Sequence, residues 1–221
     1  MDVGLPSTAA NVGDDVETEL EVNAVVEPGR EVLELNGSID PATVDPLIRR
    51  VSGAKPGEKL LIYIRANGGG STEAMFNLIE CLATSQADVE LAINRYAMSA
   101  AATLWLWFIL DPIPGVNGVG RVVSVDPLKP TVLLMHRPRL PIKDGTYYCF
   151  LEDVADEGVK QGLADLVAIF DSIFERLLER LGIGLVHAVS INEACGTYKH
   201  YLHYARDAYY SNYDYVLPLE G

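Results

Sequence analysis

The chain has 221 residues, 49% of them hydrophobic, and its formal net charge is −14 at pH 7. This length and composition fit one globular domain with a sizeable core. The acidic excess argues against nucleic acid and anionic membranes as partners, because both are themselves negatively charged.

Cysteine usage and the N-terminus predict a cytoplasmic location. Cys81, Cys149 and Cys195 are odd in number and widely spaced, which is typical of reduced thiols and not of a metal site. No basic region followed by an apolar core marks a secretory signal. The longest apolar stretch, 97–110, is too short to cross a bilayer.

The pattern along the chain predicts an α/β fold. Residues 1–29 are acidic and rich in small side chains, so we expect a flexible segment there and one domain over 30–221. Asp40 and Pro41 are a typical helix start. Alternating strands and helices favour parallel strands joined by crossover helices. We expect strands over 31–35, 59–64, 88–93, 121–124 and 131–135, and helices over 41–52, 71–84 and 99–110.

One long helix is predicted over 152–181, followed by a shorter one over 190–204. About 30 residues span about 45 Å, which is longer than a compact domain of this size needs. Phe170, Phe174 and Leu178 recur at every fourth position. Left exposed in a monomer they would form an apolar patch, so we expect this helix to pair with a second copy. The alternative is a long helix within the core of one chain.

Ser99 is the first candidate for chemistry. It stands between the expected strand 88–93 and the expected helix 99–110, with small residues on both sides. A serine at a strand-to-helix turn can present an exposed nucleophile, beside the free N–H groups of the helix N-terminus. The alternative is that Ser99 only caps the helix.

Two further strand ends carry groups that complement a nucleophile. A glycine run, 68–70, follows the strand 59–64, and His136 follows the strand 131–135. Glycines can turn backbone N–H groups toward one point. Because the ends of parallel strands meet at one edge of a sheet, these segments predict an acyl-transfer site with Ser99.

Several segments together resemble the proteolytic subunit of the Clp protease, a serine peptidase of the crotonase-like fold. The resemblance runs from about residue 31 to 220. Its motifs are the glycine turn within 62–75, the nucleophile turn 97–100, Met135-His136-Arg137-Pro138 and the Arg-Asp stretch 205–211. The resemblance implies repeated ββα units arranged in a spiral, with a protruding long "handle" helix over about 139–184.

The same resemblance implies the roles of individual residues. Ser99 would attack a peptide carbonyl, His136 would act as its base, and Asp207 would hold the imidazole tautomer. Backbone N–H groups of Gly69 and Ala100 would bind the oxyanion. Gly68 and Gly70 would contact a peptide bound as an added strand. Asp171 and Asp214 compete with Asp207 for the third position.

The resemblance also implies how the protein works. Subunits would stack as homo-oligomeric or hetero-oligomeric rings, receive unfolded polypeptides from an AAA+ unfoldase, and need no cofactor or metal. The acidic N-terminal segment would line the axial pore or remain a solvated tail. His187, His200 and His203 lack the spacing of a metal site.

Departures from the family motifs keep other functions open. Asn67 replaces the proline of the glycine turn, and Arg95-Tyr96 and Ala100-Ala101 replace glycines around the nucleophile. This is typical of a divergent member, such as one encoded by a phage. The main alternative is an inactive ring subunit with a structural role. An acyl-CoA enzyme of the crotonase type is a third, which the order Ser99, His136, Asp207 disfavours.

Overall fold

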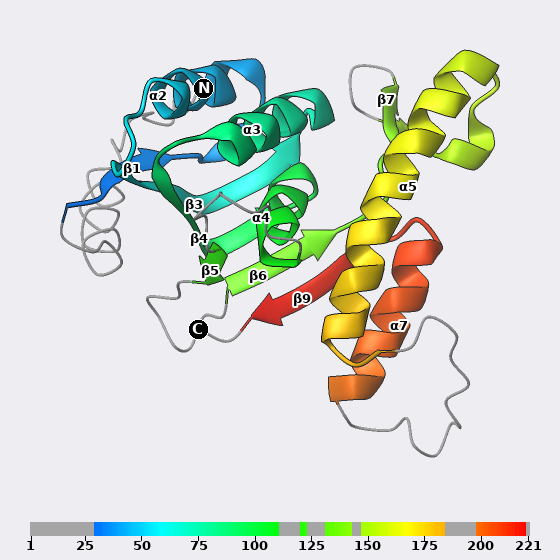
Figure 1. Cartoon of the computed structure of the whole chain (residues 1–221). Helices are drawn as coiled ribbons and strands as arrows, with labels where there is room; N and C mark the ends of the chain where they lie inside the picture. The colour runs from blue at the N-terminus through cyan, green and yellow to red at the C-terminus, as the bar shows by residue number, and fades with distance from the viewer. Residues whose placement is uncertain (1–28, 111–119, 123–130, 143–146, 184–197, 220–221) are drawn as a thin grey trace, which may run out of the picture.

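A computed structural model describes residues 29–110, 120–122, 131–142, 147–183 and 198–219 (Figure 1). The acidic segment up to residue 28, the loop 112–119, Cys195 and the start of the helix expected over 190–204 lie outside these residues. None of the described helices is both long and apolar enough to cross a membrane.

The described strands form a mostly parallel seven-stranded sheet, which confirms the α/β class. Its order is β1-β3-β4-β6-β9, with β2 beside β3 and β5 beside β4. Only the last pair, β6 with β9, is antiparallel. The bounds are Glu31–Glu34 (β1), Gly37–Ile39 (β2), Lys59–Gly70 (β3), Asp88–Met98 (β4), Gly120–Val122 (β5), Thr131–Met135 (β6) and Tyr215–Leu219 (β9).

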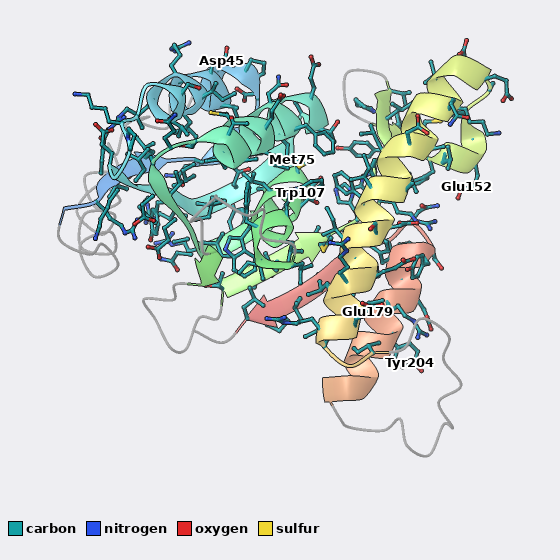
Figure 2. All side chains as sticks on the ribbon, viewed as in Figure 1. Asp45, Met75, Trp107, Glu152, Glu179 and Tyr204 are labelled. Atoms are coloured by element: carbon teal, nitrogen blue, oxygen red, sulfur yellow. The ribbon has the colours of Figure 1, made fainter. Side chains whose placement is uncertain are left out.

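Three helices follow the first strands and cover one face of the sheet (Figure 1). They are α2 (Pro41–Ser52), α3 (Thr72–Thr84) and α4 (Ala100–Leu110), each within one residue of its predicted bounds. Asp40 caps α2, as expected, by accepting a hydrogen bond from the Thr43 N–H at 3.0 Å. Of two side chains labelled in Figure 2, Met75 belongs to the core under these helices, and the half-buried Trp107 packs against that core.

The long helix is shorter than the sequence predicts. Its regular part, α5 (Glu157–Arg180), has 24 residues and so measures about 36 Å. Asp156 starts it by accepting a hydrogen bond from the Val159 N–H at 2.9 Å. A separate short 3₁₀ turn, η1 (Leu151–Asp153), precedes the break. The cap at Asp156 divides what the hydrophobic pattern predicts as one helix.

A second helix, α7 (Tyr198–Tyr210), runs beside α5 (Figure 1). In Figure 2 the label Glu179 marks α5 and the label Tyr204 marks α7. The Phe174 ring stacks on Tyr209 with 3.8 Å between centroids. Phe170, Phe174 and Leu178 are all buried within one chain. The apolar patch expected from these three side chains is therefore not exposed, and the tyrosines of α7 and β9 cover Phe174. Pairing of α5 with a second copy stays a prediction, and it would have to use other side chains.

We expect Phe174→Ala to lower the free energy of unfolding by about 3–5 kcal/mol, since it opens a cavity in this aromatic cluster. Val159→Ala, at an exposed position of the same helix, should change it by less than about 0.5 kcal/mol. Denaturant unfolding measures both. An unchanged stability of Phe174→Ala, with loss only of self-association, would restore the pairing role.

Two further strands form a hairpin that the sequence did not predict. It consists of β7 (Leu140–Ile142) and β8 (Tyr147–Cys149), paired with each other and apart from the main sheet. Leu140 and Cys149 pack against the first half of α5. Tyr147 and Tyr148 are exposed, so this hairpin presents aromatic surface.

Candidate active site

A cleft of about 700 Å³ lies where the ends of β3, β4 and β6 meet. Glycines 68–70, Ser99 and His136 all line it. Tyr148 of the hairpin and Leu163 of α5 complete part of its wall. The edge of the sheet therefore brings together the three groups that the sequence singled out, as the ends of parallel strands do in α/β proteins.

Ser99 occupies a strained turn between β4 and α4. Its φ angle is +50°, in the left-handed region that residues with a Cβ rarely adopt. Its N–H donates to the Leu134 carbonyl at 2.7 Å, and its carbonyl accepts from the Thr103 N–H at 2.9 Å. Hydrogen bonds to β6 and to α4 thus fix the turn. A strained strand-to-helix turn is the setting in which hydrolases expose a nucleophilic serine.

Gly69 packs directly against this turn. Its φ is +83°, and a Cβ added there would lie 2.6 Å from both the Met98 carbonyl oxygen and the Ser99 Cβ. No side chain fits in that space. Glycine is therefore required at position 69, because the end of β3 approaches the serine turn at backbone distance.

Asn67 engages one of the two predicted oxyanion donors. Its Oδ1 accepts a hydrogen bond from the Gly69 N–H at 2.9 Å, and its Nδ2 donates to the Leu35 carbonyl at 3.1 Å. The side chain is completely buried. Gly69 must release this bond before its N–H can bind an oxyanion. The other predicted donor, Ala100, is the first residue of α4, where N–H groups have no partner within the helix.

His136 is oriented by a backbone carbonyl. Its Nδ1 lies 2.8 Å from the carbonyl oxygen of Arg137. A carbonyl only accepts hydrogen bonds, so Nδ1 carries the proton and Nε2 is the free acceptor in the neutral ring. Burial lowers the pKa of His136 below its ordinary value of 6.5, and the Arg139 charge acts in the same direction. The Arg137 carbonyl and the Asp214 charge oppose this shift.

Only one of the three competing aspartates lines the cleft. Asp207 does not: its side chain is 64% exposed on α7, and Oδ1 accepts from the Arg206 Nη2 at 2.6 Å. Asp171 on α5 binds Arg137. Asp214 lines the cleft, with Oδ1 at 3.8 Å from the Arg139 Nη2. The expected role of Asp207 therefore has no support in this geometry, whereas Asp214 stands near His136.

The antiparallel strand explains how Asp214 reaches this position. Met135 of β6 pairs with Tyr215 of β9, so the next residues in the same register are His136 and Asp214. The sequence did not predict β9, and the placement of Asp214 depends on that strand. Arg139, whose guanidinium lies 4.5 Å above the Tyr148 ring, is a second cleft residue that sequence reasoning missed.

We expect the rate of peptide hydrolysis to fall as pH is lowered through the pKa of His136, because only the neutral ring accepts a proton. Since this pKa is lowered, the inflection in kcat/KM should lie below pH 6.5. Arg139→Gln should move it up and Asp214→Asn down. A His136→Gln protein with an unchanged rate and profile would show that the imidazole is not the base.

Metal binding has no support in the described part of the chain, where no cluster of three or more His, Cys, Asp or Glu side chains is found. His187 and the side chains of His200 and His203 lie outside that part.

Comparison with known proteins adds no relative: no protein-family model and no curated protein sequence matches the chain. The geometry of the cleft is thus the basis for assigning a function.

Proposed function

We propose that this chain is a serine endopeptidase that resembles the proteolytic subunit of the Clp protease. The observation that carries the proposal is the strained Ser99 turn, which opens into the same cleft as His136 and packs against Gly69. A hydroxyl, a neutral imidazole acceptor and helix N-terminal amides in one cleft are the parts of an acyl-transfer site.

In this mechanism Ser99 Oγ attacks the carbonyl carbon of a peptide bond while its proton passes to His136 Nε2. The oxyanion binds the Ala100 N–H, and the Gly69 N–H once it leaves Asn67. Collapse of the intermediate breaks the C–N bond, and His136 gives its proton to the leaving amine. Water then hydrolyses the acyl-enzyme by the same route.

Asp214 replaces Asp207 in our proposal as the acid of the site. Its carboxylate stabilises the imidazolium that forms when His136 takes up a proton, since an opposite charge nearby favours the charged ring. The contact that fixes the ring is the Arg137 carbonyl. In a simple triad one carboxylate both orients the imidazole and stabilises its charged form. In this proposal the Arg137 carbonyl orients the ring and the Asp214 carboxylate stabilises the charge.

The wider architecture is part of the same proposal. Subunits of the crotonase-like fold would form stacked rings in the cytoplasm, with the handle over 139–184 at the contact between rings. The exposed Ile142, Tyr147 and Tyr148 of the hairpin supply apolar surface for such a contact. Unfolded polypeptides, delivered by an AAA+ unfoldase, would bind along 68–70 as an added strand.

An inactive ring subunit with a structural role is the second candidate. The bond between the Gly69 N–H and Asn67 Oδ1 favours it, because that bond occupies an oxyanion donor. In such a protein the Ser99 turn would have no catalytic function, and no acyl-enzyme would form.

Labelling with a fluorophosphonate probe separates the two candidates. The probe forms a covalent bond only with an activated serine hydroxyl, and mass spectrometry of peptides locates the adduct. We expect modification at Ser99 and none at Ser71, which also lines the cleft but caps α3 by accepting from the Ala74 N–H. An unlabelled protein that still forms rings would favour the inactive subunit.

A further inference from the structure

Arg137, the residue that follows His136, connects the active-site segment to two helices. Its guanidinium makes a bidentate ion pair with Asp171 of α5, with Nε to Oδ1 at 3.0 Å and Nη2 to Oδ2 at 2.7 Å. Its Nη1 donates to the Tyr210 carbonyl of α7 at 3.3 Å. Both charged side chains are only 19% exposed, so the pair is largely shielded from solvent.

Aromatic rings hold the same guanidinium from the side of α7. The Arg137 Cζ lies 5.1 Å from the ring centroid of Tyr210 and 5.9 Å from that of Tyr209. Both distances lie within the range at which a cation is attracted to an aromatic face. Two helices therefore fix one side chain through four separate contacts, and a fork-shaped bidentate pair also fixes its direction.

The main chain of Arg137 is the part that touches the base. Its carbonyl oxygen is the acceptor for His136 Nδ1 at 2.8 Å. A side chain pinned at its far end restricts the rotation of its own backbone, so the position of this carbonyl depends on the helices that bind the guanidinium. The chain of contacts is thus Asp171 to the Arg137 side chain, Arg137 carbonyl to His136, and His136 to the cleft.

We propose that Arg137 is a positioning residue that selects the reactive tautomer of His136, and that Asp171 sets its position from α5. The inference rests on the proposed function, in which Nε2 of the neutral ring must face Ser99 as acceptor. It assigns to the α5–α7 helix pair a role in ordering the base, in addition to its role in the core. Without the ion pair, the carbonyl loses its fixed position and the ring samples both tautomers.

The test reads the tautomer directly, independent of activity. In Ser99→Ala protein with ¹⁵N-labelled histidines, His136 should give one protonated and one unprotonated ring nitrogen near neutral pH, assigned by their loss in His136→Gln. Arg137→Gln and the nearly isosteric Asp171→Asn are expected to average these two signals. If Arg137→Gln fails to fold, Asp171→Asn still tests the proposal, because asparagine keeps the shape of the aspartate side chain.

A matched control exists on α2, where Arg50 makes a bidentate pair with Glu31 at 2.9 and 2.6 Å. Arg50→Gln should leave the His136 signals unchanged.

In the active protein, Asp171→Asn should lower kcat about 100-fold with KM within about twofold, the cost of a misplaced catalytic group. Unchanged His136 signals in either folded variant would overturn the inference. Full activity of Ser99→Ala would instead overturn the proposed function and leave the tautomer result standing.

Discussion

Replacing Ser99 with alanine is expected to lower the turnover of a fluorogenic peptide by at least about 10⁴-fold, because it removes the proposed nucleophile and Ser71, the other serine of the cleft, is engaged in capping α3. Folding should not change. Serine and alanine both carry a Cβ, so the backbone strain at φ +50° is the same in both proteins. Steady-state hydrolysis, with melting temperature and assembly mass measured in parallel, checks this prediction.

Ser172→Ala is a suitable control, since Ser172 lies on the exposed side of α5. It should retain the full rate. Substantial hydrolysis by Ser99→Ala, at the same purity, would mean that the hydroxyl is not the nucleophile. In that case the turn would serve only to start α4.

The second large effect is expected from Gly69→Ala. The new Cβ would lie 2.6 Å from the Met98 carbonyl oxygen and from the Ser99 Cβ, at a φ that alanine disfavours. Both contacts involve atoms of the nucleophile turn, so the turn must shift. We expect kcat/KM to fall by about 100-fold or more, together with a lower melting temperature.

Gly68→Ala is the matched control for stability. Its Cβ would lie 3.6 Å from the Gly37 carbonyl oxygen, which is ordinary contact, and Gly68 has no positive φ. The melting temperature should therefore stay close to that of the parent. If Gly69→Ala were equally stable and fully active, the close approach between β3 and the serine turn would have no functional consequence.

The local parts of the fold and site were predictable from the sequence. Helices α2, α3 and α4 begin and end where caps and apolar spacing place them. Ser99 and His136 each follow a strand of the mostly parallel sheet, and the glycines form the end of β3, which extends past the predicted 59–64 to Gly70, so the three meet at one edge. Neither result needed knowledge of packing between distant segments.

The predictions that the structure does not support depend on packing between segments that are distant in sequence. Whether Phe174 is exposed is decided by the tyrosines of α7, which are distant in sequence. Asp207 falls on an exposed position of α7, whereas Asp214 reaches the cleft through β9. Asn67 was noted only as a replacement for proline, although its side chain bonds the glycine that it precedes by two positions.

The reversed direction of β9 also fixes the order in which the cleft is completed during translation. The ribosome makes Ser99 and His136 first, then Asp171, and Asp214 last. Because β9 pairs antiparallel with β6, the carboxylate arrives beside the imidazole only when the final strand joins the sheet. In the proposed peptidase, the Asp214 carboxylate would therefore be missing from the cleft until nearly all of the described chain has left the ribosome.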